Sequence, residues 1–251
     1  YIKLCKRTVN PRVSLKRGVG ELVTTFRLIE CLDSYHDAYL AHAGFAVDPE
    51  EPRRLQRAFY RTMRAVTCRA DVEAAFAAGL DALESMPARK PVDPVRVGIV
   101  GEYFTAVDPH SNLGVEEKLL GMGMEVARML NITNRNLRYH EKNLRASASR
   151  YLRYDMGPTS TLTIAAAKKY AEEGFDGIIH LKSSGCTPEI DCMPVLQRIS
   201  RDYGIPVLYL SFDSQTSDTG LDTRLEAFYD MISLRKAAPT ASQLATKGTS
   251  R

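Results

Sequence analysis

The sequence predicts an α/β protein in which a parallel-sheet lobe follows a helical amino-terminal segment. Downstream of a proline-rich stretch at residues 87–94, short apolar runs alternate with segments of helical periodicity, which is typical of a parallel sheet with right-handed crossovers. Upstream of it, from residue 18 onward, apolar residues recur mostly at spacings of three and four. We therefore expect a mainly helical segment at 1–90, an α/β lobe at 95–236 and a disordered tail at 237–251.

Three helices are expected in the amino-terminal segment, after an opening stretch at residues 1–16 that is irregular or a short strand. The first helix covers residues 18–43, where apolar side chains recur at helical spacing. The second covers residues 51–67 and has prolines at its start, a position that helices tolerate. The third covers residues 69–86 and is rich in alanine. Together they make the segment mainly helical.

Strands and helices alternate in the lobe. Three strands are predicted at residues 95–100, 177–181 and 206–212, and a fourth is expected near 126–132. Pro194 lies inside one predicted helix and indicates a kink or a late start there. The predicted helices cover residues 113–129, part of 133–154, 161–174, 188–203 and 221–235. In the first of these, Gly121 and Gly123 are expected to be weak points or a break.

Composition places the chain among ordinary soluble globular proteins. It has 251 residues, of which 44% are hydrophobic and 25% charged, enough for one large domain or two small ones. The net charge of +4 is weakly basic, and no nucleic-acid-binding motif accompanies it. No apolar run approaches the roughly 20 residues of a membrane span, and no signal peptide opens the sequence. We therefore expect neither nucleic acid nor membrane as a partner.

The cysteines indicate the compartment. They are odd in number and mostly far apart in the sequence, at Cys5, Cys31, Cys68, Cys186 and Cys192. This pattern disfavours a disulfide framework and favours a reducing, cytoplasmic environment. Because the sequence starts at Tyr1 rather than at a methionine, we also expect a fragment or a processed chain.

Three polar loops follow the predicted strands. The first covers residues 101–112, the second 183–189 and the third 213–217, and each combines small residues, hydroxyls and a carboxylate. Because parallel strands deliver their carboxyl ends to one edge, we expect these loops to converge there, where open α/β sheets usually bind their ligands. Ordinary surface turns have a similar composition, so the expected convergence carries more weight than the residue types.

Cys186 is the candidate with the clearest chemistry. It stands in the second loop just before Thr187, a suitable N-cap, and Pro188, a suitable first helical residue. The positive helix end and its free N–H groups favour a thiolate, the form that ligates metals or attacks electrophiles. Cys192 lies six positions on, which is no standard zinc or ferredoxin spacing. From spacing alone, Cys186 is as compatible with an unreactive loop cysteine as with a ligand.

Two histidines and several absent motifs narrow the chemistry further. His180 lies within a predicted strand and is more typical of a satisfied core imidazole than of a catalyst. His110, in a loop with proline, serine and asparagine, is more site-like. HExxH, GxGxxG and P-loop patterns are absent from the sequence. A thiol-dependent enzyme with Cys186 as nucleophile and His110 as base is therefore one alternative.

Four sequence blocks follow one another in the lobe in a specific order: VGIVGEYFTAVDPHSNLGVEEKLLGMGMEV, KKYAEEGFDGIIHL, residues 186–202 and SFDSQTSDTGLDTRLEAFYDMI. Together they resemble the carboxy-terminal region of the acyl-CoA dehydratase activase-related proteins. These belong with the 2-hydroxyacyl-CoA dehydratase subunits and the double-cubane-cluster reductases. The resemblance covers residues 95–234, over half of the chain, and the helical first third is less distinctive.

The resemblance implies a Rossmann-like lobe with an iron–sulfur cluster, of the 4Fe-4S or double-cubane type, bound in a cleft. It implies that Cys186, which shortly precedes Pro-Glu-Ile, is one metal ligand, and that the cleft is lined by Glu102, Ser184, Glu189 and Gln215. An ATP-hydrolysing activase partner would feed low-potential electrons to the cluster. We also expect a homo-oligomer.

Two features of the family are missing from this sequence. The Gly/Cys-rich amino-terminal lobe that supplies further ligands is not found, and no histidine occupies residues 155–160, where related proteins have a Gly-His-rich stretch. The missing lobe or a second subunit must then complete the cluster. We predict the carboxy-terminal part of an iron–sulfur protein with a role in low-potential electron transfer. The alternative is a non-catalytic binding or scaffold domain that keeps the fold, in which case this chain alone holds no cluster.

Overall fold

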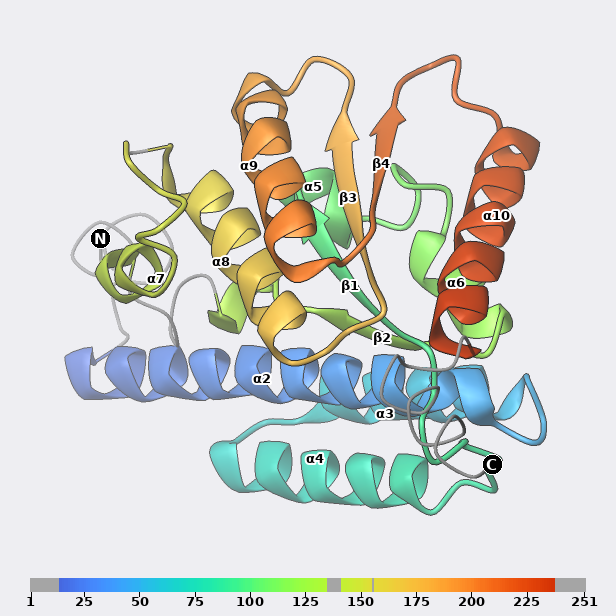
Figure 1. Ribbon diagram of the computed structural model, residues 1–251. Helices are drawn as coiled ribbons and strands as arrows, with labels where there is room; N and C mark the ends of the chain where they lie inside the picture. Colours follow the sequence, from blue (N-terminus) through green and yellow to red (C-terminus); the bar gives the residue numbers. More distant parts are fainter. Residues whose placement is uncertain (1–13, 135–140, 155, 238–251) are drawn as a thin grey trace, which may run out of the picture. The chain divides into compact units, whose positions relative to one another are not determined.

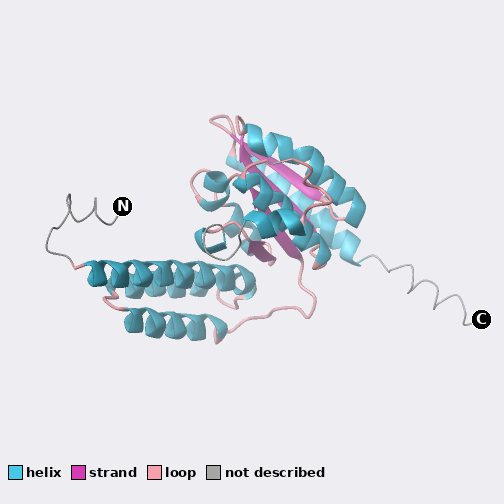
Figure 2. Cartoon of the chain, turned by 90° about the vertical axis from the view of Figure 1, so that its left-hand side faces the viewer, coloured by secondary structure: helices cyan, strands magenta, loops and turns pink. Residues whose placement is uncertain are grey.

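The computed structural model of the chain describes residues 14–134, 141–154 and 156–237 (Figure 1). The chain folds into two compact units, which divide between Arg89 and Lys90. The described part of the first unit is built from helices (Figure 2), namely α2 (Leu15–His42), the short η1 (Ala43–Phe45), α3 (Glu51–Ala65) and α4 (Arg69–Glu84).

An aromatic stack and a bidentate ion pair hold the helical unit together. The buried rings of Tyr35 on α2 and Phe59 on α3 stack with their centroids 3.8 Å apart. Arg27 of α2 binds both carboxylate oxygens of Glu73 on α4 at 2.7 Å. The two contacts tie α2 to both α3 and α4 in the described part of this unit.

A four-stranded parallel sheet forms the centre of the second unit (Figure 1). Its inner strands are almost wholly buried and mostly apolar, as strands covered on both faces are, although β3 also carries His180 and Lys182. The strands, in the spatial order β2-β1-β3-β4, are β1 (Arg96–Gly101), β2 (Glu125–Arg128), β3 (Gly177–Ser183) and β4 (Val207–Phe212). The predicted α/β class, a Rossmann-like parallel lobe preceded in the sequence by a helical segment, is therefore confirmed.

Helices cover both faces of this sheet (Figure 1). On one face lie α8 (Pro158–Glu172) and α9 (Thr187–Tyr203), and on the other lie α6 (Val115–Gly121) and α10 (Asp218–Ala237). Gly98 of β1 faces the Tyr170 ring of α8 so closely that an added Cβ would lie 2.1 Å from it. On the opposite face, Lys118 of α6 binds Asp222 of α10 at 2.5 Å. Helices therefore pack tightly against the sheet from both sides.

The predicted helix at 113–129 is interrupted at the expected break, and its continuation beyond Gly123 is wrong. The helix expected at 113–129 ends at Gly121, and the chain turns at Gly123, which has a φ of 75°. The strand β2 then starts at Glu125, close to the expected fourth strand. Glycine adopts this left-handed conformation readily, which explains why the helix stops here.

Smaller differences concern helix ends. A short helix α5 (Tyr103–Val107) follows β1, and its five residues are too few to show a periodicity. The late start expected at Pro194 is wrong, because α9 begins at Thr187 and continues through the proline. A further helix, α7 (Glu141–Ser147), lies within the helical stretch predicted for 133–154.

Two predictions fall beyond what the structure describes. Residues 1–13 of the opening stretch and residues 238–251 of the tail lie outside the described residues. None of the helices that the structure describes is long and apolar enough to cross a membrane.

Candidate functional site

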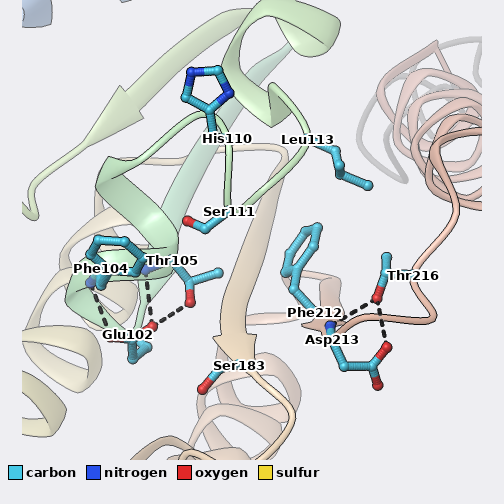
Figure 3. Close-up of a pocket in the computed structure, with 10 residues that line it drawn as sticks. All are labelled: Glu102, Phe104, Thr105, His110, Ser111, Leu113, Ser183, Phe212, Asp213 and Thr216. Carbon is cyan, nitrogen blue, oxygen red and sulfur yellow. Dashed lines mark hydrogen bonds between the residues drawn. The ribbon is translucent and has the colours of Figure 1, made fainter.

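The carboxyl ends of β1, β3 and β4 meet at a pocket of about 460 Å³ (Figure 3). All three polar loops contribute to its lining, so they converge at one edge of the sheet, as the topology predicts. The residues with polar side chains that line it include Thr105, His110 and Ser111 from the first loop, Ser183 from the end of β3, and Asp213 and Thr216 from the third loop.

Glu102 lines the pocket and closes the first loop on itself. Its carboxylate accepts hydrogen bonds from the backbone N–H groups of Phe104 at 3.0 Å and Thr105 at 2.9 Å, and from the Thr105 hydroxyl. It thereby caps α5. The preceding Gly101 has a φ of 137°, and an added Cβ would lie 1.9 Å from the carbonyl oxygen of Leu181. Only glycine therefore lets the end of β1 run this close to β3.

Asp213 ties the second loop to the third. Its carboxylate accepts hydrogen bonds from the Ser184 hydroxyl and from the backbone N–H of Gln215, each at 2.9 Å. These bonds, that of Gln215 first, hold the pKa of Asp213 below its ordinary value. Gln215 thus contributes its backbone N–H here, and its side chain is not part of the pocket lining. Asp213 is not among the individually predicted site residues. An aspartate directly after a strand and before hydroxyl residues is nevertheless a sequence signal for such a turn.

Cys186 itself, and not the expected Thr187, occupies the N-cap of α9, so Thr187 rather than Pro188 is the first helical residue. Its backbone N–H donates to the Ser183 carbonyl at 3.2 Å, and its own carbonyl accepts from the N–H of Ile190 at 3.0 Å. The side chain is half-buried and the thiol is free. Ser183 lines the pocket and Cys186 does not, so Cys186 follows the pocket-lining residue of its loop by three positions in the sequence.

Glu189 and His180 lie in the interior. Glu189 is 1% exposed to solvent, and His180 is fully buried. The distance from His180 Nε2 to Glu189 Oε2 is 2.9 Å, and the Thr163 hydroxyl lies 3.3 Å from Glu189 Oε1. His180 is therefore a core imidazole with a polar partner. The resemblance assigns Glu189 to the cleft lining, but its side chain points inward, because this side of the first turn of α9 faces β3.

Cys192 is unsuited to be a second ligand beside Cys186. It is fully buried, and its thiol faces the carbonyl oxygen of Ser160 at 3.9 Å. Burial, and after it the charge of Glu189, raises the pKa of the Cys192 thiol far above its ordinary value. A thiol in this setting stays protonated and inert.

The described residues fit one ligand position of a metal cluster. They contain no group of three or more His, Cys, Asp or Glu side chains that could hold a metal ion. Cys31 and Cys68 belong to the helical unit, and Cys5 lies outside the described residues. Iron–sulfur clusters take their ligands from several thiolates. Cys186 can fill one such position, and the remaining ligands must come from elsewhere.

His110 and Cys186 are not brought together as base and nucleophile. His110 lines the pocket, and its backbone N–H lies 3.4 Å from the Asp108 carboxylate. In the described part of the chain, no hydrogen bond links His110 to Cys186, whose backbone partners are Ser183 and Ile190. A thiol activated by a neighbouring base needs them within roughly 3 Å of each other. The arrangement therefore gives the thiol-enzyme alternative no support.

Residues 36–232 of the chain match the protein family described as 2-hydroxyglutaryl-CoA dehydratase, D-component. The match runs from within α2 of the helical unit into α10 of the α/β unit. It therefore includes Cys186 and every residue that lines the pocket. No curated protein matches the chain.

Proposed function

Because the chain belongs to the 2-hydroxyglutaryl-CoA dehydratase D-component family, we propose that it is one component of a system that dehydrates 2-hydroxyacyl-CoA thioesters. Its working part is the carboxyl edge of the sheet, where three loops surround the pocket of about 460 Å³. The observation that carries the proposal is Cys186, a free and half-buried thiol at the N-cap of α9, beside this edge.

Cys186 serves in this proposal as one thiolate ligand of an iron–sulfur cluster. The thiol is free and stands at the start of α9, and a metal binds such a side chain as the thiolate. Among the described cysteines of the α/β unit, the other is Cys192, whose burial keeps it protonated. Cysteines outside the described residues, in a further lobe or in a second subunit, supply the other ligands.

In this proposal, Glu102, Asp213 and Ser184 influence the cysteine ligand indirectly, because they hold the loops of the sheet edge in place. Glu102 and Asp213 each fix a loop by accepting backbone N–H groups, so the loops are held before any ligand arrives. Ser184 belongs to the loop that carries Cys186 and is tied to Asp213 through its hydroxyl. Gln215, next to these residues, adds a polar side chain on the solvent side. Hydrogen bonds that a polar group such as the Gln215 amide donates to a cluster tune its potential.

The cluster, when bound, would carry low-potential electrons that reach it from an ATP-hydrolysing activase. This chain's own part is to hold one ligand on a rigid sheet edge and to present the pocket next to it. The activase partner follows from the family and not from any surface of this chain.

A second candidate is a binding or scaffold domain that keeps the fold without a cluster. The single accessible thiol of the described α/β unit favours it, because one thiolate cannot hold a cluster alone. Both candidates use the same fold and differ in whether iron is bound.

Iron content decides between them. We would purify the protein anaerobically from its own cells, with any partner chains, and measure iron and acid-labile sulfide per chain. Cys186→Ala should lower both, and Cys68→Ala, at an exposed cysteine of the helical unit, should leave them unchanged. Iron-free parent protein, or equal iron in the parent and in Cys186→Ala, would remove the cluster proposal.

A further inference from the structure

The buried pair of Glu189 and His180 needs a physical reason. Both side chains are almost wholly inside the protein, where a carboxylate loses its hydration and is stabilised only by its partners. Replacing such a pair by apolar side chains of similar volume often leaves stability equal or higher. A pair that does not add stability is retained more readily where it fixes one arrangement over others.

The hydrogen bonds of the pair define its geometry. Within the described residues, His180 Nδ1 is buried and has no partner, while Nε2 faces Glu189 at 2.9 Å. An Nε2–H donor leaves only a lone pair bare at Nδ1, whereas the opposite tautomer would bury an unpaired N–H, which is more costly. The imidazole of β3 therefore donates to the carboxylate of α9.

Thr163 extends the pair to two further elements. Its hydroxyl lies 3.3 Å from Glu189 Oε1 and 3.2 Å from the carbonyl oxygen of Gly101, so it links α8 to the end of β1. The carboxylate of Glu189 thus faces a donor from β3 and the Thr163 hydroxyl of α8, whose single hydrogen is shared with the Gly101 carbonyl of β1. Glu189 lies in the first turn of α9, three residues after Cys186.

We infer that Glu189, held by His180 and Thr163, is a positioning residue that fixes the start of α9 and so sets where Cys186 stands at the sheet edge. Glu189 does not line the pocket, and the thiol beside its carboxylate is that of Cys192 rather than that of Cys186. It acts through the backbone, because the carbonyl of Cys186 accepts the N–H of Ile190, the residue next to Glu189. The use of this device rests on the proposed function, whereas the anchoring itself does not.

The loop before Cys186 has a separate anchor, which makes the inference testable. Lys182 is 5% exposed, and its ammonium lies 3.4 Å from the carbonyl oxygens of both Ser183 and Ser184. The N–H of Ser184 donates to Phe212 of β4 at 2.9 Å. Loss of the Glu189 anchor should therefore loosen the start of α9 and leave this loop in place.

Hydrogen exchange of two backbone amides tests the inference. The amide of Ile190 reports the bond to the Cys186 carbonyl, and the amide of Ser184 reports the loop. In Glu189→Ala we expect Ile190 to exchange about tenfold faster or more, since the Nε2–H of His180 loses its acceptor. Ser184 should keep its parental rate. In Glu189→Gln, whose amide oxygen can accept from His180 and whose amide N–H can donate to Thr163, Ile190 should stay within about threefold of the parent.

Two controls complete the design. Lys169→Ala removes an exposed ion pair with Glu173 in the same unit and should change neither amide. If Glu189→Ala does not fold, Thr163→Val replaces it, and the same selective acceleration at Ile190 is expected. An unchanged Ile190 rate, equal acceleration of both amides, or Glu189→Gln behaving like Glu189→Ala would overturn the inference. The exchange is measured on iron-free protein, so absence of a cluster would sink the proposed function and leave this result standing.

Discussion

Gly101 offers the sharpest test of how the sheet edge is built, through the substitution Gly101→Ala. The residue has a φ of 137°, which side-chain-bearing residues rarely adopt, and an added Cβ would lie 1.9 Å from the backbone oxygen of Leu181. The strained conformation costs about 1–3 kcal/mol, and relieving the clash costs about 1–3 kcal/mol more. The clash cannot be relieved by a rotamer change, because the atom that is hit belongs to the backbone of β3.

The assay is thermal unfolding of the parent and the variant, followed by circular dichroism. A loss of about 2–6 kcal/mol should lower the unfolding midpoint by roughly 4–24 °C in a protein of this size. Gly185→Ala is the matched control, because a Cβ there meets nothing within 4 Å and the residue needs no left-handed backbone. A Gly101→Ala midpoint within error of the Gly185→Ala midpoint would refute the description of this edge.

Three further predictions follow from single contacts. Ser184→Ala should raise the pKa of Asp213, which NMR titration measures. Because the pKa of Asp213 is depressed in the folded protein, the stability that this carboxylate contributes is present above about pH 4 and is lost as the pH falls through the folded pKa. An unchanged pKa would contradict the hydrogen bond. Iodoacetamide at neutral pH should alkylate Cys186 far faster than Cys192, which is buried with a raised pKa, and mass spectrometry showing equal labelling of both would count against this burial. Arg27→Lys should destabilise the helical unit by about 0.5–1 kcal/mol in urea unfolding, because a lysine cannot reproduce the two-point bond to α4, and no change would show that the fork adds nothing.

The topology of the second unit is predictable because its strands are buried on both faces. Gly177–Ser183 and Arg96–Gly101 read as apolar runs between helical segments, and that pattern leaves few arrangements other than a parallel sheet. Gly121 and Gly123 indicate a possible break, but that the helix does not resume is harder to predict, because the apolar residues beyond them continue a pattern that also suits a helix. The positive φ of Gly123 decides against the helix, and periodicity carries no information on φ.

The candidate site, too, is predictable from the sequence only in part. Strand ends identify the loops, so Glu102 and the loop with Ser184 can be found from the sequence. The direction in which Glu189 points cannot, because both an exposed and a buried carboxylate suit the first turn of a helix. Its burial depends on His180, a partner nine residues away on a neighbouring strand, and only the packing of α9 on β3 brings the two together.

The central claim is that the thiolate of Cys186 binds iron, and the electron paramagnetic resonance spectrum of the reduced protein tests it most directly. Cys186→Ser replaces the sulfur by oxygen at the same position and should shift the g values of the cluster if that atom is a ligand. The spectrum of Cys68→Ser, at an exposed cysteine of the helical unit, should match the parent. A Cys186→Ser spectrum identical to the parent in g values and intensity would show that Cys186 does not hold the cluster.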